Sequence, residues 1–198
     1  MASLKNLITL FLSLGCLLSL GQSGNTKPIT IKLVNKCTEA VFPAFRNVTN
    51  TDNPYRGGLQ PGGDQYDVQV DIYQGRIWPR TGCVLSPTGL KCKTGDCGGE
   101  RCTAEGIGDY TFAELIHTSS DHVNLGLKYK NQVNIPMEFK PANTYGEQHC
   151  KTLTCIQTGC GNNTLSGACK IPNSFLLTFC PNNGVEYDSI HTSVLEDN

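Results

Sequence analysis

The sequence lacks the features that several large classes of protein require. It has one tryptophan, two methionines and a formal net charge of −1, so nothing suggests electrostatic capture of nucleic acid or of an anionic membrane. It contains no Cys-x2-Cys pair, which a thioredoxin-type redox site needs. It also contains no Gly-x-Ser-x-Gly motif, the usual setting of a hydrolase serine. Helical periodicity, internal repeats and low-complexity linkers are absent as well.

Residues 1–24 have the layout of a secretory signal peptide. Lys5 supplies a short positive region, an apolar run follows over residues 7–20, and the small residues Gly21, Ser23 and Gly24 offer cleavage points. The run is shorter than the ~20 residues that a membrane-spanning helix needs. We therefore expect a secreted protein of the extracellular space or apoplast, with no membrane span. Loss of Lys5 would leave a net charge of −2.

Cysteine is abundant. There are eleven cysteines, and Cys16 falls within the predicted signal peptide. An even number of cysteines in an exported chain indicates a disulfide framework, and ten allow about a thousand complete pairings, so spacing alone leaves the connectivity open. The stretch "CKTGDCGGERC" at 92–102 has two Cys-x4-Cys spacings, but no second pair of that kind lies close by and no histidine has a suitable spacing, so we predict no metal site. The ten remaining cysteines are Cys37, Cys83, Cys92, Cys97, Cys102, Cys150, Cys155, Cys160, Cys169 and Cys180.

Short alternating segments predict the fold. Apolar residues occupy every second position in 29–33, 67–73, 122–130 and 174–179, with Val123, Leu125, Leu127 and Tyr129 as the inward set of the third segment. Such alternation marks half-buried strands, and Gly- and Pro-rich turns separate the segments. We predict an all-β sandwich of short antiparallel strands in one domain, residues 25–181.

Two regions differ from this sandwich. Residues 150–169 contain four cysteines and little apolar material, so we expect a small disulfide-rich loop that crosslinks must order. Residues 182–198 are polar and contain no cysteine, which predicts a loose C-terminal tail. Acceptor sequons for N-glycosylation stand at Asn47 and Asn162, both in polar, turn-rich segments.

Several phrases together resemble the thaumatin-like proteins, the pathogenesis-related family that includes thaumatin and osmotin. They are "ITIKLVNKC", "LQPGG", "GRIWPRTGC", "CKTGDCGGERC", "TFAEL", "VNIPMEF" and "TFCP", in the family's order from Ile29 to Pro181. Full-length members have sixteen cysteines and a helical second domain, so ten cysteines and the short 150–169 loop resemble the small subclass. The resemblance implies five disulfides: Cys37–Cys180, Cys83–Cys92, Cys97–Cys102, Cys150–Cys169 and Cys155–Cys160.

The resemblance also implies a ligand cleft. Family members line it with an arginine, a glutamate and several aspartates, and it is linked to binding and sometimes weak hydrolysis of β-1,3-glucan. Arg76 and Glu114 match the first two, whereas Asn124 and Asn131 stand where aspartates are expected. Asparagine cannot ionise, so Glu114 is the only matching acid, and the face of Asn124 is expected to be positive and polar.

Other acids and single residues leave alternatives open. Asp96, Asp109 and Asp121 stay open as acids that approach the cleft, although Asp96 fits a turn between bridges better. Trp78 fits a core position better than a sugar-stacking one. The four histidines are scattered and suggest no ligand set.

The expected function follows from the resemblance. It is a secreted, monomeric defence or host–microbe protein at the cell wall that binds β-1,3-glucan without catalysis or inhibits a wall-active glycoside hydrolase, and it needs no cofactor. The alternatives are a weak antifungal endo-β-1,3-glucanase and a stable extracellular protein without a defined ligand.

Overall fold

The computed structural model describes residues 28–47, 58–70, 74–119, 122–142, 150–156, 159–160, 169–170 and 174–182. The predicted signal peptide, Asn162 and the tail beyond residue 182 lie outside these ranges. All regular elements in the described ranges are strands. None of these ranges contains a helix long and apolar enough to cross a membrane.

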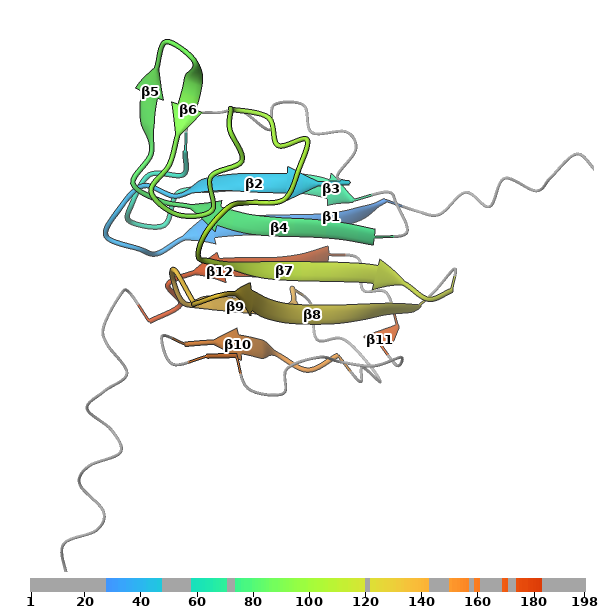
Figure 1. Ribbon diagram of the computed structural model, residues 1–198. Coiled ribbons are helices and arrows are strands. Elements are labelled where there is room, and N and C mark those ends of the chain that lie inside the picture. The colour runs from blue at the N-terminus through green and yellow to red at the C-terminus, as the bar shows by residue number, and fades with distance from the viewer. Residues whose placement is uncertain are drawn as a thin grey trace, which may run out of the picture.

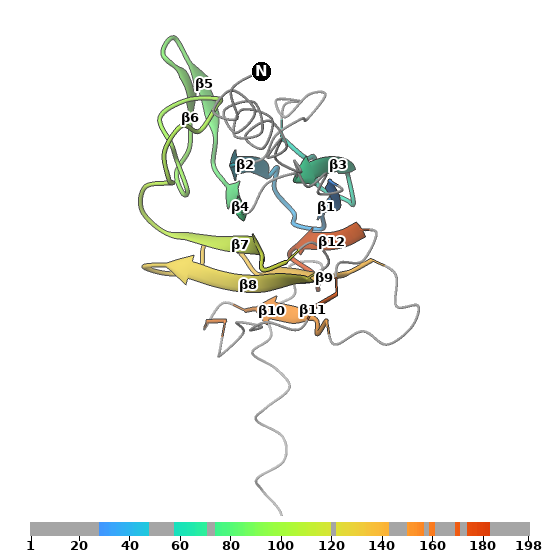
Figure 2. The same ribbon diagram turned by 90° about the vertical axis from the view of Figure 1, so that its right-hand side faces the viewer.

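Two five-stranded sheets make up the domain (Figures 1 and 2). The first sheet has the order β10–β9–β12–β1–β3 and the second sheet has the order β11–β8–β7–β4–β2. The first sheet consists of β1 (Ile29–Asn35), β3 (Gln65–Val70), β9 (Met137–Pro141), β10 (Leu153–Cys155) and β12 (Ser174–Phe179). The second sheet consists of β2 (Phe42–Arg46), β4 (Gln74–Arg80), β7 (Tyr110–His117), β8 (His122–Lys130) and β11 (Cys169–Lys170).

A separate hairpin of β5 (Val84–Ser86) and β6 (Gly89–Lys91) projects from one end of the sandwich in both views. The disulfide Cys83–Cys92 joins the residues directly before β5 and directly after β6. The hairpin is therefore closed covalently at its base.

The all-β prediction is confirmed, with two corrections. β1 and β12 pair in parallel, with Leu33 opposite Leu177, rather than antiparallel. These strands come from opposite ends of the domain, so no tight turn fixes their relative direction. The second correction is Tyr129, which was expected to face inward but is 46% exposed. β8 continues past the buried residues Leu125 and Leu127, so Tyr129, near the end of the strand, lies beyond the core.

The main core lies between the two sheets. Because side chains alternate along a strand, the odd-numbered residues of β1 and β12 point toward the second sheet. Buried residues from both sheets form one cluster, which includes Ile31, Leu33, Phe175 and Leu177 of the first sheet and Ile77, Leu115, Leu125 and Leu127 of the second. The disulfide Cys37–Cys180 ties the ends of β1 and β12 beside this core, across a sequence separation of 143.

A smaller core lies on the other side of the second sheet, its outer face. Ala44, Trp78 and Tyr110 are buried there, with Phe112 packed against them. The long loop between β6 and β7 covers this cluster, and the Trp78 indole donates a hydrogen bond of 2.9 Å to the Gly95 carbonyl. Trp78 is 1% exposed, so it is a core residue and not a stacking platform.

Candidate functional site

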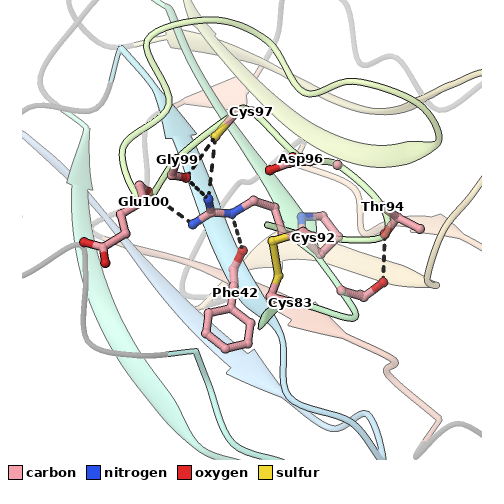
Figure 3. The surroundings of a disulfide bond; sticks show 12 residues. Phe42, Cys83, Cys92, Thr94, Asp96, Cys97, Gly99 and Glu100 are labelled. Atoms are coloured by element: carbon pink, nitrogen blue, oxygen red, sulfur yellow. Dashed lines mark hydrogen bonds between the residues drawn. A yellow bond between two sulfur atoms is a disulfide. The ribbon is translucent and has the colours of Figure 1, made fainter. Parts of the chain in front are cut away.

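The loop that contains Cys97 and Cys102 is fixed to the outer face by a buried arginine. Arg80 is 4% exposed, and its guanidinium donates to the carbonyls of Phe42, Gly99 and Glu100 (Figure 3). The disulfide Cys97–Cys102 closes the same part of the loop. The disulfide therefore constrains the shape of the loop, and the charge-assisted hydrogen bonds from Arg80 to its backbone hold it against the sheet.

Asp96 is a turn residue in this loop. Its carboxylate accepts a 3.2 Å hydrogen bond from the Gly98 backbone N–H, and the backbone of Asp96 forms an isolated antiparallel β-bridge with Ile107 across the loop. Gly98 has a φ of +84°, a conformation that glycine adopts without strain.

Two glycines let the loop lie flat on Trp78. A Cβ atom at Gly106 would stand 2.9 Å from the Trp78 indole nitrogen, and one at Gly95 would stand 2.8 Å from the Pro79 carbonyl oxygen. Larger residues would therefore lift the loop off the sheet. Because Gly106 lies this close to Trp78, its neighbour Glu105 is placed at the edge of the part of the face that the loop covers.

One row of residues crosses the uncovered part of the outer face. Register pairs Arg46 with Arg76, Arg76 with Glu114, and Glu114 with Gly126, on β2, β4, β7 and β8. Two arginines directly opposite each other repel unless a negative group lies between them. Glu105, which comes from the loop, supplies that group, because its Oε1 atom accepts hydrogen bonds from both Arg46 (2.9 Å) and Arg76.

Glu114 is the most enclosed charged group of this row. Its side chain is 4% exposed. Its Oε1 atom accepts from Arg76 Nε at 2.8 Å and from Gln74 Nε2 at 3.0 Å, and Arg76 Nη2 lies 2.7 Å from the same atom. Its Oε2 atom accepts from Lys128 Nζ at 2.8 Å. Both carboxylate oxygens are therefore occupied by donors.

These donors decide the charge state of Glu114. Burial alone would raise the pKa of its carboxyl, but the hydrogen bonds from Lys128, Arg76 and Gln74 outweigh burial and lower the pKa below its ordinary value of 4.5. Glu114 is thus ionised at any pH above that value.

The result is a ladder of alternating charge, which we call the charge ladder: Arg46, Glu105, Arg76, Glu114 and Lys128. A pocket of about 160 Å³ lies at one end of it. Its lining residues are Arg46, Asn47, Gln74, Arg76 and Glu105.

Part of the predicted cleft assembles on this face. Arg76 and Glu114 are in direct contact. Asn124 lies two residues before Gly126 on β8 and pairs with Ile116, so it shares the outer face with Glu114. It is half-buried.

Asn131 is not brought to the cleft. It follows Lys130, which lies about 14 Å along β8 from the residue opposite Glu114. Its side chain donates a 3.0 Å hydrogen bond to the Gly108 carbonyl, and its φ of +58° turns the chain away from the sheet. Asn131 therefore closes a turn.

Glu105 is the member of the site that sequence reasoning missed. The acids considered as partners of Glu114 were Asp96, Asp109 and Asp121, and Asp121 lies outside the described residues. Glu105 sits in an irregular loop next to Gly106, so no periodicity places it. Its link to Arg76 spans 29 residues and exists only once the loop has folded over Trp78.

Four of the five disulfides implied by the resemblance are present: Cys37–Cys180, Cys83–Cys92, Cys97–Cys102 and Cys155–Cys160. Cys150 is also disulfide-bonded, while the side chain of Cys169 lies outside the described part of the chain. Among the described residues, no group of three or more His, Cys, Asp or Glu side chains is arranged to hold a metal ion.

Comparison with known proteins gives one consistent family. The family model described as "Thaumatin family" matches residues 35–183. A thaumatin-like protein of Oryza sativa subsp. japonica is 30% identical, over 80% of this chain and 89% of its own length. An osmotin-like protein of Solanum lycopersicum is 34% identical, over 83% of this chain and 66% of its own length. Pathogenesis-related protein 1A/1B of Hordeum vulgare is 29% identical, over 77% of this chain and 88% of its own length.

Proposed function

The chain belongs to the thaumatin family, and from this premise we propose that it is a secreted defence protein that binds a cell-wall polysaccharide without cleaving it. Relatives whose names mark them as pathogenesis-related support the defence role. The predicted signal peptide and the disulfides support secretion into an oxidising compartment.

The observation that carries the non-catalytic part is the state of Glu114. Glycoside hydrolysis normally needs one carboxylic acid to protonate the leaving oxygen and a second carboxyl to act as nucleophile or base. A general acid is useful when its pKa is raised, as burial alone would do. The donors around Glu114 have the opposite effect, so this carboxyl holds no proton to give at neutral or mildly acidic pH.

The second carboxylate does not restore an acid–base pair. The Oε1 atom of Glu105 accepts hydrogen bonds from two guanidinium groups, and Asn124 has no ionisable group. Arg76 lies between Glu105 and Glu114 and contacts both, so the carboxylates clamp an arginine rather than an open space for a glycosidic bond. This arrangement supports a preformed polar surface for sugar hydroxyls.

Two measurements on the purified secreted protein test the proposal. Sedimentation with insoluble β-1,3-glucan, cellulose and xylan measures binding, and a reducing-end assay on linear β-1,3-glucan measures cleavage. We expect binding to a wall polysaccharide with no reducing ends above the blank. Release of reducing ends that Glu114→Gln abolishes would establish the glucanase alternative. Absence of binding to any wall polysaccharide would favour the stable protein without a ligand.

One observation favours a second candidate, inhibition of a wall-active glycoside hydrolase. Val84 and Leu85 are 64% and 79% exposed on the projecting hairpin. The Cys83–Cys92 disulfide holds this hairpin before any partner binds, which reduces the entropy lost on binding. Inhibition assays with microbial xylanases test this candidate, and Leu85→Ser should relieve any inhibition.

A further inference from the structure

We propose that the outer face of the second sheet selects acidic, uronate-rich polysaccharide over neutral glucan. This inference rests on the proposed function, because it names the chemical class of polysaccharide that the same face would hold. Three features of the face support it: the ends of the charge ladder, the balance of charge across the two sheets, and the spacing of the exposed cations.

The residues at both ends of the charge ladder are cations that can donate further hydrogen bonds to a ligand. Arg46 and Lys128 have side chains that are 45% and 42% exposed. Within the described residues only the Nη1 group of Arg46 is hydrogen-bonded, and Lys128 has one partner for its three N–H groups. The inner members, Arg76 and Glu114, are committed to each other. A ligand therefore meets donors of positive charge at both ends.

The charge of this face contrasts with that of the opposite face. On the described strands of the first sheet, the outward-facing charged residues are two cations and two carboxylates, Lys32, Lys140, Asp67 and Glu138. Among the described residues, the uncovered outer face of the second sheet has five cations against two carboxylates. The cations are Arg46, Arg76, Lys128, Lys130 and Lys170, and the carboxylates are Glu105 and Glu114. In the described part of a chain that is close to neutral as a whole, positive charge is thus concentrated on the outer face of the second sheet.

The spacing of the cations fits a polymer better than a small anion. Arg46 on β2 and Lys128 on β8 are separated by three strand spacings, about 14 Å across the sheet, and Lys128 also lies two residues along β8 from the row of Arg46. One small anion cannot reach both, whereas an extended chain with a carboxylate on each sugar can. A bidentate or charge-assisted hydrogen bond to each carboxylate is also stronger than one to a neutral hydroxyl. Gly126 contributes no side chain beside Glu114, and the Lys128 side chain occupies this space on its way to the Glu114 carboxylate.

The experiment compares polymers that differ in charge. Polygalacturonate, its fully methyl-esterified form, linear β-1,3-glucan and dextran sulfate are titrated against the secreted protein by calorimetry at low and at physiological salt. We expect polygalacturonate to bind tighter than both neutral polymers. Salt should weaken that binding, because exposed charges are screened within about 10 Å at 0.1 M ionic strength.

A matched pair of double variants locates the binding surface. Arg46→Gln with Lys130→Gln removes two cations from the outer face without touching Glu114. Lys32→Gln with Lys140→Gln removes the same charge from the first sheet. The first variant should lose about tenfold in affinity for polygalacturonate, and the second should bind as wild type does. Circular dichroism checks that both are folded.

The outcomes separate this inference from the proposed function. Tighter binding to β-1,3-glucan than to polygalacturonate would overturn the inference and leave the proposed function intact. If the protein binds none of the four polymers and no other wall polysaccharide, both the inference and the proposed function are overturned. Dextran sulfate bound as tightly as polygalacturonate would replace uronate selection by general polyanion capture. Equal losses in the two double variants would show that the outer face is not the site.

Discussion

Replacing Glu114 by glutamine tests the charge ladder most directly. The glutamine side chain keeps the shape of glutamate and one acceptor oxygen, but it loses the charge and turns the second oxygen into an N–H donor. That new donor would face either Lys128 or Arg76, both of which are donors themselves. The variant therefore keeps some of the hydrogen bonds and sets one donor against another.

The cost can be bounded from the surroundings of Glu114. Removing one partner of a fully buried ion pair costs about 3–5 kcal/mol. Glu114 is buried, but the side chains of Arg76 and Lys128 are 28% and 42% exposed, so water can solvate them after the change. We expect a loss of about 2 kcal/mol at pH 7. For a domain of this size that corresponds to a fall in Tm of roughly 4–8 °C.

The loss should depend on pH in a defined direction. Folded Glu114 has a pKa below 4.5, whereas unfolded Glu114 titrates near that value. Its stabilising contribution is thus complete above pH 4.5 and disappears as the pH falls through the folded pKa. The difference in stability between wild type and Glu114→Gln should be largest at neutral pH and shrink below pH 4.5.

Guanidinium denaturation with the disulfides intact measures both effects, with Glu138→Gln as the control. Glu138 also forms a lysine pair, to Lys140 at 2.7 Å, but on the more open first sheet, so its loss should cost less than about 1 kcal/mol. If Glu114→Gln is as stable as Glu138→Gln at pH 7, the ladder contributes little. A stability difference that grows as the pH falls would contradict the charge state assigned to Glu114.

Three further changes give separate tests. Both ring nitrogens of His117 are buried and have no hydrogen-bond partner in the described part of the chain, and burial lowers the pKa of His117 below 6.5. Because the unfolded state then binds a proton more readily, the stability of the wild type should fall as the pH drops below 6.5. His117→Leu should remove this fall between pH 7 and pH 5 in guanidinium denaturation. Trp78→Phe removes the bond to Gly95 and should cost about 2–3 kcal/mol in guanidinium denaturation. Asn47 stands in an acceptor sequon and lines the pocket, so we expect a glycan there that hinders access to the face. Asn47→Gln should then lower the mass of the secreted protein and tighten polysaccharide binding, whereas Asn162→Gln should leave binding unchanged.

Period-two alternation was enough to predict the all-β class and several strands. Segments such as 29–33 and 174–179 alternate cleanly because each has one face on the core. Alternation did not predict that β1 and β12 lie side by side in parallel, because pairing between distant strands depends on which edges remain unpaired after the local hairpins form. β4 escaped notice because four of its residues in a row are buried, by the main core on one face and the loop on the other.

The candidate site was predictable only where it lies on strands. Arg76 and Glu114 were found because the family phrases "GRIWPRTGC" and "TFAEL" contain them, and the register of β4 and β7 brings the two residues together. Asn131 was misplaced because a loop of different length shifts alignment without changing the motif that follows. Glu105 gave no signal, because its position is set by contacts of the covering loop with Trp78 and Arg80.

The cysteine-rich loop consequently has a part in the site as well as in stability. A carboxylate on an untethered loop would lose side-chain and backbone entropy on reaching the two arginines, and an exposed ion pair rarely offsets such a loss. Here Cys97–Cys102 and Arg80 have already fixed the loop, so Glu105 meets Arg46 and Arg76 at little further entropic cost. Without Glu105 the two arginines would repel each other across β2 and β4. The covalent framework therefore lets this small domain hold a concentrated set of cations on one face, and that set distinguishes it from the acidic cleft implied by its resemblance to other thaumatin-like proteins.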